Sequence, residues 1–460
     1  MLQVVQAFDG APITQIATDD AAALEAKLQA AQRAFRNREG WLEPHQRMAI
    51  LRRLAGLVEA KRDHFAVQIA REGGKPLPDA IVETTRAIDG VHNAADELRN
   101  LSGREIPMGL SPAAIDRWAF TTKEPIGIVA AISAFNHPLN LIVHQVAPAI
   151  AVGCPVIIKP AGTTPLSCLD FVALVHEAGL PEAWCQTFIP ETTELAEELA
   201  TDPRIAFLSF IGSAKVGWYL HSKLAHGARS ALEHGGAAPA IVDRSADLDT
   251  IIEPIVKGGY YHAGQVCVST QRIFVHQDIA SDFTERLVAR VKALKVGDPV
   301  LKDVEVGPLI LPKEVDRVAS WIDEAVKYGA RIATGGRRIS LTTLEPTVLL
   351  DPSPEAKVTQ LEVFGPAVCV YRYEKLDDAI AQANALPVAF QASIFAQDID
   401  VALRAANRLD ASAVMINDPT TFRTDWMPFA GRRESGYATG GIPFTMRDMT
   451  QEKMILMRKT

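Results

Sequence analysis

The sequence predicts an α/β protein with parallel sheets, and two observations lead to this prediction. From about residue 126 onward, short runs rich in β-branched residues alternate with stretches whose apolar residues recur at helical spacing. Such strand–helix alternation is typical of parallel sheets covered by helices on both faces. In addition, a chain of 460 residues exceeds what one hydrophobic core usually organises, so two or three domains are expected.

The individual elements can be placed from these patterns. Before residue 100 the spacing predicts helices at residues 21–36, 45–72 and 77–98. Strands are then expected at residues 126–133, 156–159, 186–189, 205–210 and 239–242. Helices are expected between them at residues 138–152, 165–177, 193–200 and 213–224. A second alternating block runs from residue 249 to about 415, and the C-terminal residues form an arm that could pair with the sheet edge of another subunit.

Composition argues against several classes of protein. The 47 basic and 55 acidic residues give a net charge of −8, and Lys and Arg form no block, so no nucleic-acid partner is expected. The first residues lack the basic and apolar regions of a secretion signal. The most apolar stretch, residues 139–158, contains Asn, His, Gln, Pro and Gly, which predicts a buried helix and a strand rather than a membrane span. We therefore expect a cytoplasmic protein without a membrane partner.

The five cysteines indicate reduced thiols. Their number is odd and they are widely spaced, which argues against disulfides and against a zinc site, so no metal is expected. Those at positions 154, 168, 185 and 369 are expected to be small buried hydrophobic side chains. Only Cys267, in the run GQVCV at residues 264–268, has a neighbourhood that would leave its sulfur accessible.

Cys267 has a possible partner in Glu233, which opens the run EHGG. A thiol nucleophile and a carboxylate base are the two groups needed to form a covalent acyl intermediate and then to hydrolyse it. The pair alone is weak evidence, because a cofactor site and a site for an oxyanion are also needed.

The dinucleotide fingerprint G-x-G-x-x-G and the phosphate-binding P-loop are both missing from the sequence. In their place the run FIGSAKVG follows a predicted strand at residues 210–217. Gly212 would permit a tight turn, and Ser213 could cap the next helix or donate to a phosphate at its N-terminus. Taken alone, this run is also compatible with an ordinary strand–helix turn.

These runs belong to a longer ordered series. Its members are EPIG at residues 124–127, FNHPL at 135–139, GCPVIIKP at 153–160, Gly212-Ser213, Glu233, Cys267, EVFGP at 362–366, PFAG at 428–431 and Ser435-Gly436. In this order and at these spacings, the chain closely resembles the aldehyde dehydrogenase superfamily over nearly its whole length. The resemblance implies an NAD- or NADP-dependent enzyme that oxidises a small aldehyde.

The resemblance also implies catalytic roles for three residues. Cys267 resembles the nucleophile that attacks the aldehyde carbonyl. The side-chain amide of Asn136 and the backbone N–H of Cys267 resemble the oxyanion hole, and Glu233 resembles the base that activates water for hydrolysis of the thioester. On residue type alone, Asn136 could instead cap a helix beginning at Pro138, and the two roles are compatible.

Six positions resemble cofactor-binding residues. Lys159 would hold the adenosine ribose, Gly212 and Ser213 the pyrophosphate, Glu362 the nicotinamide ribose and Phe364 the nicotinamide face. Without the resemblance, Lys159 and Glu362 would be read as surface charges. Gly162 stands where the family usually has a Glu that bonds both ribose hydroxyls. Its absence would remove repulsion toward a 2′-phosphate, so we expect NADP to be accepted.

Three further residues are candidates for substrate binding. Arg86, His137 and Arg423 are similar in placement to the anion-binding residues of phosphonoacetaldehyde dehydrogenases, although the Arg that precedes the nucleophile there is Val266 here. They would suit a phosphonate, sulfonate or carboxylate about two carbons from the aldehyde. In the alternative reading, Arg86 is a solvated helix residue, His137 starts a helix and Arg423 pairs with Asp425.

The resemblance implies three structural parts and a homodimer or homotetramer. A doubly wound cofactor domain is expected at residues 1–106 and 126–236, a catalytic α/β domain at 237–430, and a β-arm for oligomerisation at 107–125 and 431–460. Alternative activities are a CoA-acylating dehydrogenase, a nucleotide-free cysteine hydrolase using Cys267 with His234 or His262, and a non-catalytic relative. His234 replaces a usual Leu, and Ala430-Gly431 replaces a usual Gly–Gly pair; neither change is expected to abolish the chemistry.

Overall fold

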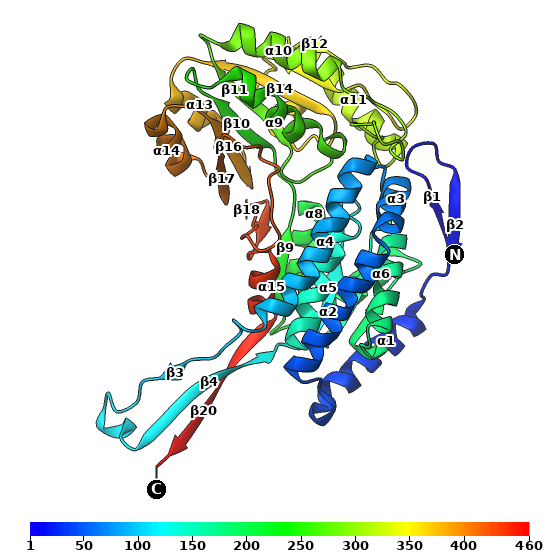
Figure 1. The fold of residues 1–460 in the computed structure, drawn as a ribbon, viewed down its shortest axis with the longest axis vertical. Helices are drawn as coiled ribbons and strands as arrows, with labels where there is room; N and C mark the ends of the chain where they lie inside the picture. The colour runs from blue at the N-terminus through cyan, green and yellow to red at the C-terminus, as the bar shows by residue number, and fades with distance from the viewer. Residues whose placement is uncertain (460) are drawn as a thin grey trace.

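The computed structural model describes residues 1–459 and contains two α/β units and a projecting β-arm (Figure 1). The sheet of the first unit has the strand order β19-β9-β8-β5-β6-β7. Its five parallel strands are β5 (Ile128–Ile132), β6 (Val156–Lys159), β7 (Cys185–Thr187), β8 (Ile205–Ile211) and β9 (Arg229–Glu233), and β19 (Gly436–Tyr437) is antiparallel. The predicted α/β architecture is confirmed.

Helices cover both faces of this sheet, as the alternation predicts. They are α1 (Ala21–Arg36), α2 (Pro44–Ala60), α3 (Arg62–Gly73), α4 (Leu77–Glu97), α5 (Asn140–Val152), α6 (Leu166–Glu177), α7 (Thr193–Thr201) and α8 (Ala214–Ser222). Val129 and Ala131 of β5 pack in the core formed with α2 to α6, whereas Ile128, Ala130 and Ile132 pack in the core formed with α1 and α7. Successive side chains of a strand point to opposite faces, so β5 is buried on both.

The second unit repeats this design with the strand order β12-β13-β14-β11-β10-β16-β17. The strands are β10 (Ala238–Val242), β11 (Thr270–His276), β12 (Arg331–Thr334), β13 (Thr347–Leu350), β14 (Ala367–Tyr373), β16 (Gln391–Phe395) and β17 (Ala413–Ile416). Helices α9 (Leu248–Tyr260), α10 (Ala280–Lys292) and α11 (Pro312–Lys327) cover one face, and α13 (Leu376–Ala383) and α14 (Ile399–Arg408) cover the other. The domain boundary at residues 236/237 stays a prediction; β9 and β10, on either side of it, belong to different sheets.

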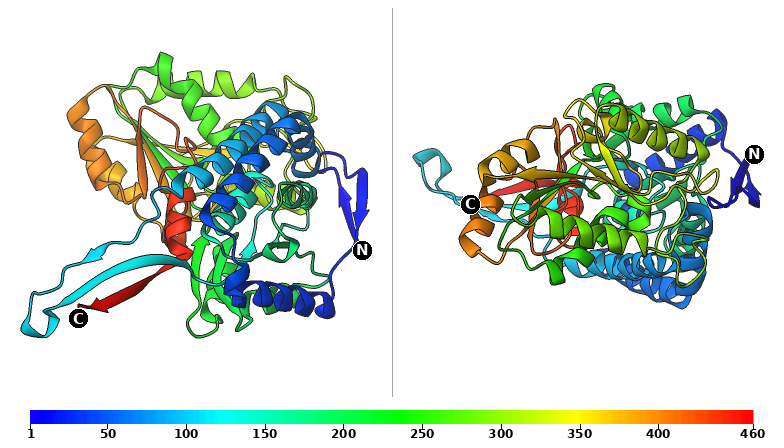
Figure 2. Two further views of the ribbon diagram at one scale, coloured as in Figure 1. Left: turned by 60° about the horizontal axis from the view of Figure 1, so that its bottom comes forward. Right: turned by 90° about the horizontal axis from the view of Figure 1, so that it is seen from above.

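The arm is a three-stranded antiparallel sheet of order β20-β4-β3 (Figure 2). Strand β20 (Thr450–Arg458) pairs along its whole length with β4 (Arg117–Pro125), and β3 (Glu105–Ile106) lies on the other side of β4. One edge of β20 is therefore unpaired among the described residues. The arm exposes the large apolar side chains Trp118, Met454, Ile455, Leu456 and Met457. No helix of residues 1–459 is long and apolar enough to span a membrane.

The element boundaries differ from the predicted ones in two informative places. The predicted helix at 45–72 is two helices, α2 and α3, with a break at Lys61 (φ −108°, ψ 20°). Apolar spacing continues across the break, so periodicity could not reveal it. Strand β9 was not among the predicted strands, because its sequence, RSALE, lacks the β-branched residues that mark the other strands.

Two buried glutamates hold the starts of the helices behind the site. Glu83 of α4 accepts hydrogen bonds from the backbone N–H groups of Leu139 and Asn140 at the start of α5, and it forms a buried ion pair with Lys75. Glu72 of α3 likewise accepts from the backbone N–H groups of Leu166 and Ser167 at the start of α6. The first N–H groups of a helix have no partner within the helix, so these carboxylates satisfy groups that burial would otherwise leave unpaired.

Candidate active site between the two sheets

The carboxyl ends of four parallel strands open into one cavity of about 910 Å³. The last residues of β5, β6, β8 and β9 all line it: Ile132, Lys159, Ile211 and Glu233. Strand order reverses here, because the chain continues from β5 to β6 on one side and returns as β8 on the other. Such a switch point is where open α/β sheets bind their ligands.

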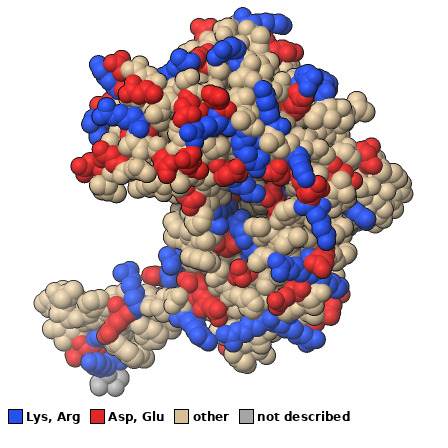
Figure 3. Space-filling model, turned by 45° about the horizontal axis from the view of Figure 1, so that its top comes forward, with Lys and Arg blue, Asp and Glu red and all other residues tan. Residues whose placement is uncertain are grey.

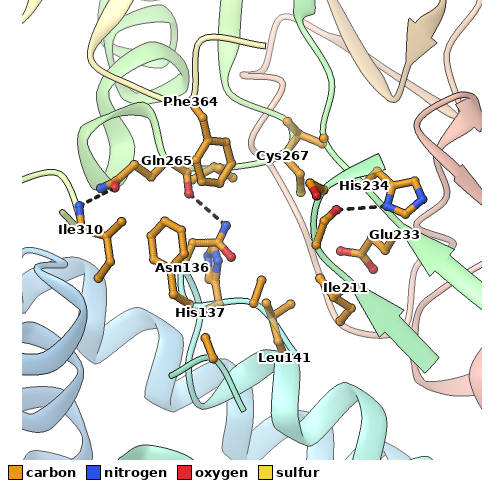
Figure 4. A pocket seen from close by; sticks show the side chains of 18 of the residues that line it. Asn136, His137, Leu141, Ile211, Glu233, His234, Gln265, Cys267, Ile310 and Phe364 are labelled. Atoms are coloured by element: carbon orange, nitrogen blue, oxygen red, sulfur yellow. Dashed lines mark hydrogen bonds between the residues drawn. The ribbon is translucent and has the colours of Figure 1, made fainter. Parts of the chain in front are cut away.

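The cavity brings together nearly all of the predicted site residues. Figure 4 labels Asn136, His137, Glu233, Cys267 and Phe364 among them. Its lining includes Arg86, Asn136, His137, Lys159, Gly212, Ser213, Glu233, Cys267, Glu362, Phe364 and Arg423. Gly162 is exposed and lies between two lining residues, Ala161 and Thr163. The structure thus places these residues together, whereas their individual roles stay predictions.

Cys267 lies in a strained loop between η4 (Tyr261–Gly264) and β11. His262 and Ala263 have φ of 49° and 53°, in the left-handed region that residues with a side chain rarely occupy. Gly264 is also left-handed, and a Cβ there would lie 2.2 Å from the carbonyl oxygen of Gly365. The tight approach of these two loops fixes where Cys267 stands. Cys267 is partly exposed, whereas the other four cysteines are buried.

Asn136 is bound to the Cys267 loop. Its amide Nδ2 donates to the backbone oxygen of Gln265 at 2.9 Å. The Gln265 side chain in turn donates to the carbonyl oxygens of His262 and Pro308 and accepts from the backbone N–H of Ile310. An amide group carries two N–H donors, so Asn136 keeps one for a further acceptor in the cavity. Figure 4 shows Asn136, Cys267 and Glu233 around the same space.

The negative charge of the Glu233 carboxylate disfavours the thiolate form of Cys267. Burial raises the pKa of Glu233, and the guanidinium of Arg423, whose Nη1 lies 3.9 Å from Glu233 Oε1, acts in the lowering direction. Burial also raises the pKa of the Cys267 thiol well above its ordinary value, and the nearby Glu233 carboxylate raises it further, whereas Arg423 lowers it. Cys267 is therefore a neutral thiol at neutral pH in this state, and removing charge from Glu233 would make it more acidic.

The other end of the cavity fits a dinucleotide. Ser213 precedes α8, and its hydroxyl makes no capping hydrogen bond to that helix, which leaves the first N–H groups of α8 free for a phosphate. Lys159 makes no ion pair or hydrogen bond with the described residues through its ammonium group, and burial lowers its pKa. A partly buried cation and an uncapped helix start suit the ribose and pyrophosphate of a nucleotide cofactor.

Glu362 and Phe364 also line the cavity. The Glu362 carboxylate rests on Gly235, where a Cβ would lie 1.9 Å from Oε1, and it accepts from the backbone N–H of Gly236 at 3.2 Å. Burial raises the pKa of Glu362 to about 8. Phe364 has a left-handed φ of 45°, and its ring meets the ring of Phe135 edge-on with centroids 5.9 Å apart. Backbone strain at this position is typical of a residue held in place for function.

His234 faces the aromatic residues near α8. Its Nδ1 lies 3.0 Å from the carbonyl oxygen of Gly212 and therefore donates to it, and its ring packs edge-on against Phe210 and Trp218. Burial lowers the pKa of His234. This geometry matches packing rather than a partnership with Cys267.

The three predicted substrate residues, Arg86, His137 and Arg423, line the cavity near one another, since the charges of both arginines act on His137; this part of the cavity is the candidate substrate end. Arg86 of α4 forms a two-pronged ion pair with Asp425, with Nη2 2.8 Å from Oδ1 and Nε 3.3 Å from Oδ2. The alternative of a solvated Arg86 and an Arg423–Asp425 pair is therefore wrong: Asp425 binds Arg86, whose side chain is 20% exposed. Burial and the neighbouring cations Lys75 and Arg86 lower the pKa of His137 well below its ordinary value, so His137 is neutral.

Three residues of this network were not predicted from the sequence as site residues: Gln265, His144 and Asp425. His144 and Asp425 are 281 positions apart, yet His144 Nε2 lies 2.7 Å from Asp425 Oδ1. The available signal was the presence of His144, together with Asn140 and Gln145, in the mostly apolar α5, because a buried polar residue needs a partner. Its partner could not be identified without the fold.

The cavity as a whole is basic, although the chain is acidic. Its lining contains six cationic residues, Arg86, Lys159, Lys257, Lys313, Arg317 and Arg423, and three acidic ones, Glu233, Glu314 and Glu362. Figure 3 shows basic side chains within the hollow between the two units. A positive cavity in a chain of net charge −8 indicates anionic ligands.

Comparison with other proteins agrees with this description. Residues 1–455 match the model of the aldehyde dehydrogenase family. The 3-sulfolactaldehyde dehydrogenase of Priestia aryabhattai is 34% identical, over 99% of this chain and 94% of its own length. Aldehyde dehydrogenase 21 of Physcomitrella patens, solved with succinate, superposes with a TM-score of 0.95 and 34% identity, covering 100% of this chain and 95% of its own.

A third relative was solved with a cofactor. Glyceraldehyde-3-phosphate dehydrogenase of Methanocaldococcus jannaschii, complexed with NADP, has a TM-score of 0.94 and 31% identity, covering 100% of this chain and 99% of its own. The chain belongs to the aldehyde dehydrogenase family. It is an NAD(P)-dependent aldehyde dehydrogenase.

Because Glu233 raises the pKa of Cys267 and Arg423 lowers it, changes at these two residues should alter the rate at which the Cys267 thiol is alkylated. In the Glu233→Gln variant the thiolate loses its negative neighbour, so iodoacetamide should alkylate Cys267 about 3- to 10-fold faster at about pH 8. In Arg423→Gln the reaction should be slower. The measurement is the alkylated fraction of the Cys267 peptide by mass spectrometry, with the exposed variant Asp303→Asn as control. Slower alkylation of Glu233→Gln than of the wild type would contradict this electrostatic account.

Proposed function

We propose that this enzyme oxidises a short aldehyde with an anionic tail to its carboxylic acid, through a thioester on Cys267 that water hydrolyses with Glu233 as base. The observation that carries the proposal is the state of Arg423. Its side chain is 9% exposed, its Nε has no hydrogen-bond partner among residues 1–459, and its only carboxylate neighbour within 4.0 Å there is Glu233 at 3.9 Å. A buried guanidinium with free donors, in the cavity that contains Cys267, is a binding site for an anion.

The first half of the reaction forms a bond between sulfur and carbon. The Cys267 thiol first gives up its proton to water, and the resulting thiolate attacks the aldehyde carbon, whose carbonyl oxygen takes up the negative charge. The free N–H of Asn136 and the backbone N–H of Cys267 are the donors for that oxygen, and the loss of one such donor slows turnover roughly 10²–10³-fold. NAD(P), when bound, supplies the acceptor for the hydride that leaves this carbon. Cys267 then carries the acyl group as a thioester.

The second half breaks the bond between sulfur and carbon. Glu233 removes a proton from a water molecule, whose oxygen attacks the thioester carbon, and the Cys267 sulfur leaves. The products are the carboxylic acid and the free thiol. A base whose pKa is raised by burial suits this step, because it binds the proton more firmly than an exposed carboxylate. A CoA-acylating enzyme needs no such base, so the presence of Glu233 in the cavity favours hydrolysis.

Two of the relatives support an anionic tail. One is named for 3-sulfolactaldehyde, which carries a sulfonate, and another was solved with succinate, a dicarboxylate. The homodimer or homotetramer expected from the family stays a prediction, supported by the free edge of β20 and the exposed apolar side chains of the arm.

We predict that Arg423 distinguishes anionic from neutral aldehydes. The Arg423→Gln variant also lacks the effect of Arg423 on the pKa of Cys267, which changes the rate for both kinds of substrate equally. The informative quantity is therefore the ratio of kcat/KM for succinate semialdehyde to kcat/KM for propanal, in which this common effect cancels. Loss of a charged hydrogen-bond partner should lower this ratio at least about 10-fold. The exposed variant Arg432→Gln is the matched control. An equal loss for both substrates would refute the anionic tail.

We also propose that NADP is accepted, because position 162 carries no carboxylate. A Cβ at Gly162 would meet no atom within 4 Å, so a larger side chain fits there without disturbing its neighbours. Gly162→Glu should lower the NADP-to-NAD ratio of kcat/KM at least about 10-fold, since the new carboxylate repels a 2′-phosphate. Gly162→Gln, which adds the same shape without charge, is the control. A large preference of the wild type for NAD at equal concentrations would overturn the proposal.

A further inference from the structure

The cations around the substrate end of the cavity are matched by carboxylates, with one exception. Lys75 is paired with Glu83, Lys257 with Asp79 and Arg86 with Asp425. Among residues 1–459, Arg423 has only Glu233 as a carboxylate neighbour within 4.0 Å, at 3.9 Å. The guanidinium of Arg86 is therefore neutralised before any substrate arrives, and the charge available to a substrate belongs to Arg423.

His144 holds Arg423 without cancelling that charge. Asp425 is an acceptor in its ionised form, so His144 Nε2, 2.7 Å from Asp425 Oδ1, is the donor. This fixes the tautomer and leaves a lone pair on Nδ1, which lies 3.4 Å from Arg423 Nη2. Burial lowers the pKa of His144 to about 4, so its ring is neutral at neutral pH. A neutral acceptor orients the guanidinium, whereas a carboxylate would have neutralised it.

The remaining contacts of Arg423 also preserve its charge. Its guanidinium stacks on the ring of Phe429 at 3.4 Å from the centroid, a contact that stabilises a cation without pairing it. Burial raises the pKa of Asp425, but His144 and Arg86 outweigh this and hold the pKa below its ordinary value, so Asp425 stays ionised. His137 and His144 are neutral. Whether Glu233 is ionised or protonated, the site offers at most one unpaired positive charge.

We infer that the Asp425–His144 pair makes this site selective for a tail with one negative charge, a carboxylate or a sulfonate, over a doubly charged phosphonate or phosphate. This inference rests on the proposed function and deepens it. A singly charged tail would complete an ion pair with Arg423. A second negative charge would enter a buried site without a counter-ion, and such a charge is strongly disfavoured. Asp425 and His144 act as positioning residues: Asp425 neutralises Arg86, and His144 orients Arg423.

The first test compares two aldehydes of nearly the same shape with the wild-type enzyme. At about pH 9 a phosphonate carries close to two negative charges, whereas a sulfonate carries one. The value of kcat/KM for sulfoacetaldehyde should exceed that for phosphonoacetaldehyde at least about 10-fold, or 1.4 kcal/mol. If both anionic aldehydes outpace propanal and phosphonoacetaldehyde is the better of the two, this inference is overturned and the proposed function stands. Equal rates for propanal and sulfoacetaldehyde would overturn both.

Two variants then test the mechanism of selection. Asp425→Asn frees the charge of Arg86, so the phosphonate-to-sulfonate ratio of kcat/KM should rise about 10-fold, whereas Asp410→Asn, at a partly exposed position outside the cavity lining, should leave it unchanged. His144→Leu removes the acceptor for Arg423 and should raise KM for sulfoacetaldehyde about 10-fold while kcat changes less than about threefold. His144→Gln, which can still bridge Asp425 and Arg423, should restore KM. An unchanged ratio in a folded Asp425→Asn enzyme would contradict the inference.

Discussion

The hydrogen bond from Asn136 to Gln265 joins two loops of the candidate active site that belong to different sheets. Asn136 belongs to the loop after β5 of the first sheet, and Gln265 belongs to the loop before β11 of the second. The bond from Asn136 Nδ2 to the Gln265 carbonyl sets the position of the amide relative to Cys267, two residues further along the chain. The proposed mechanism depends on the position of this amide, because a donor to the oxyanion that is displaced by about 1 Å would lose much of its effect.

Buried hydrogen bonds on both sides of this bond hold the segments that contain Asn136 and Gln265. On one side the buried Glu83 carboxylate holds the start of α5, close after Asn136, and its own charge is matched by Lys75. On the other side the Gln265 side chain ties the Cys267 loop to the backbone of Pro308 and Ile310. Removing one partner of a buried pair costs about 3–5 kcal/mol, so such pairs hold the geometry firmly. The strained backbone at His262 and Ala263 is stabilised by the same surroundings.

Much of this arrangement could be predicted from the sequence. Strand–helix alternation indicated the parallel sheets, and the ordered motifs indicated that Cys267, Glu233 and Asn136 would meet. What the sequence could not supply were contacts that depend on the complete fold. Arg86 and Asp425 are 339 positions apart, and only the packing of α4 against the segment after β17 makes them neighbours. The ion pair between Arg86 and Asp425 could therefore be identified only from the structure. It shows that Arg86, which the sequence suggested as a free cation, is neutralised by a carboxylate.

The central claim is that Cys267 carries the acyl group until Glu233 releases it. The most direct test mixes the Glu233→Gln enzyme with NAD(P) and a substrate aldehyde, and follows the reduced nicotinamide together with the mass of the Cys267 peptide. The account predicts about one equivalent of reduced nicotinamide per subunit, then a stall with the acyl group on Cys267, because the thioester forms but is not hydrolysed. Continued turnover at the wild-type rate, or one equivalent of reduced nicotinamide without a mass increase on Cys267, would contradict it.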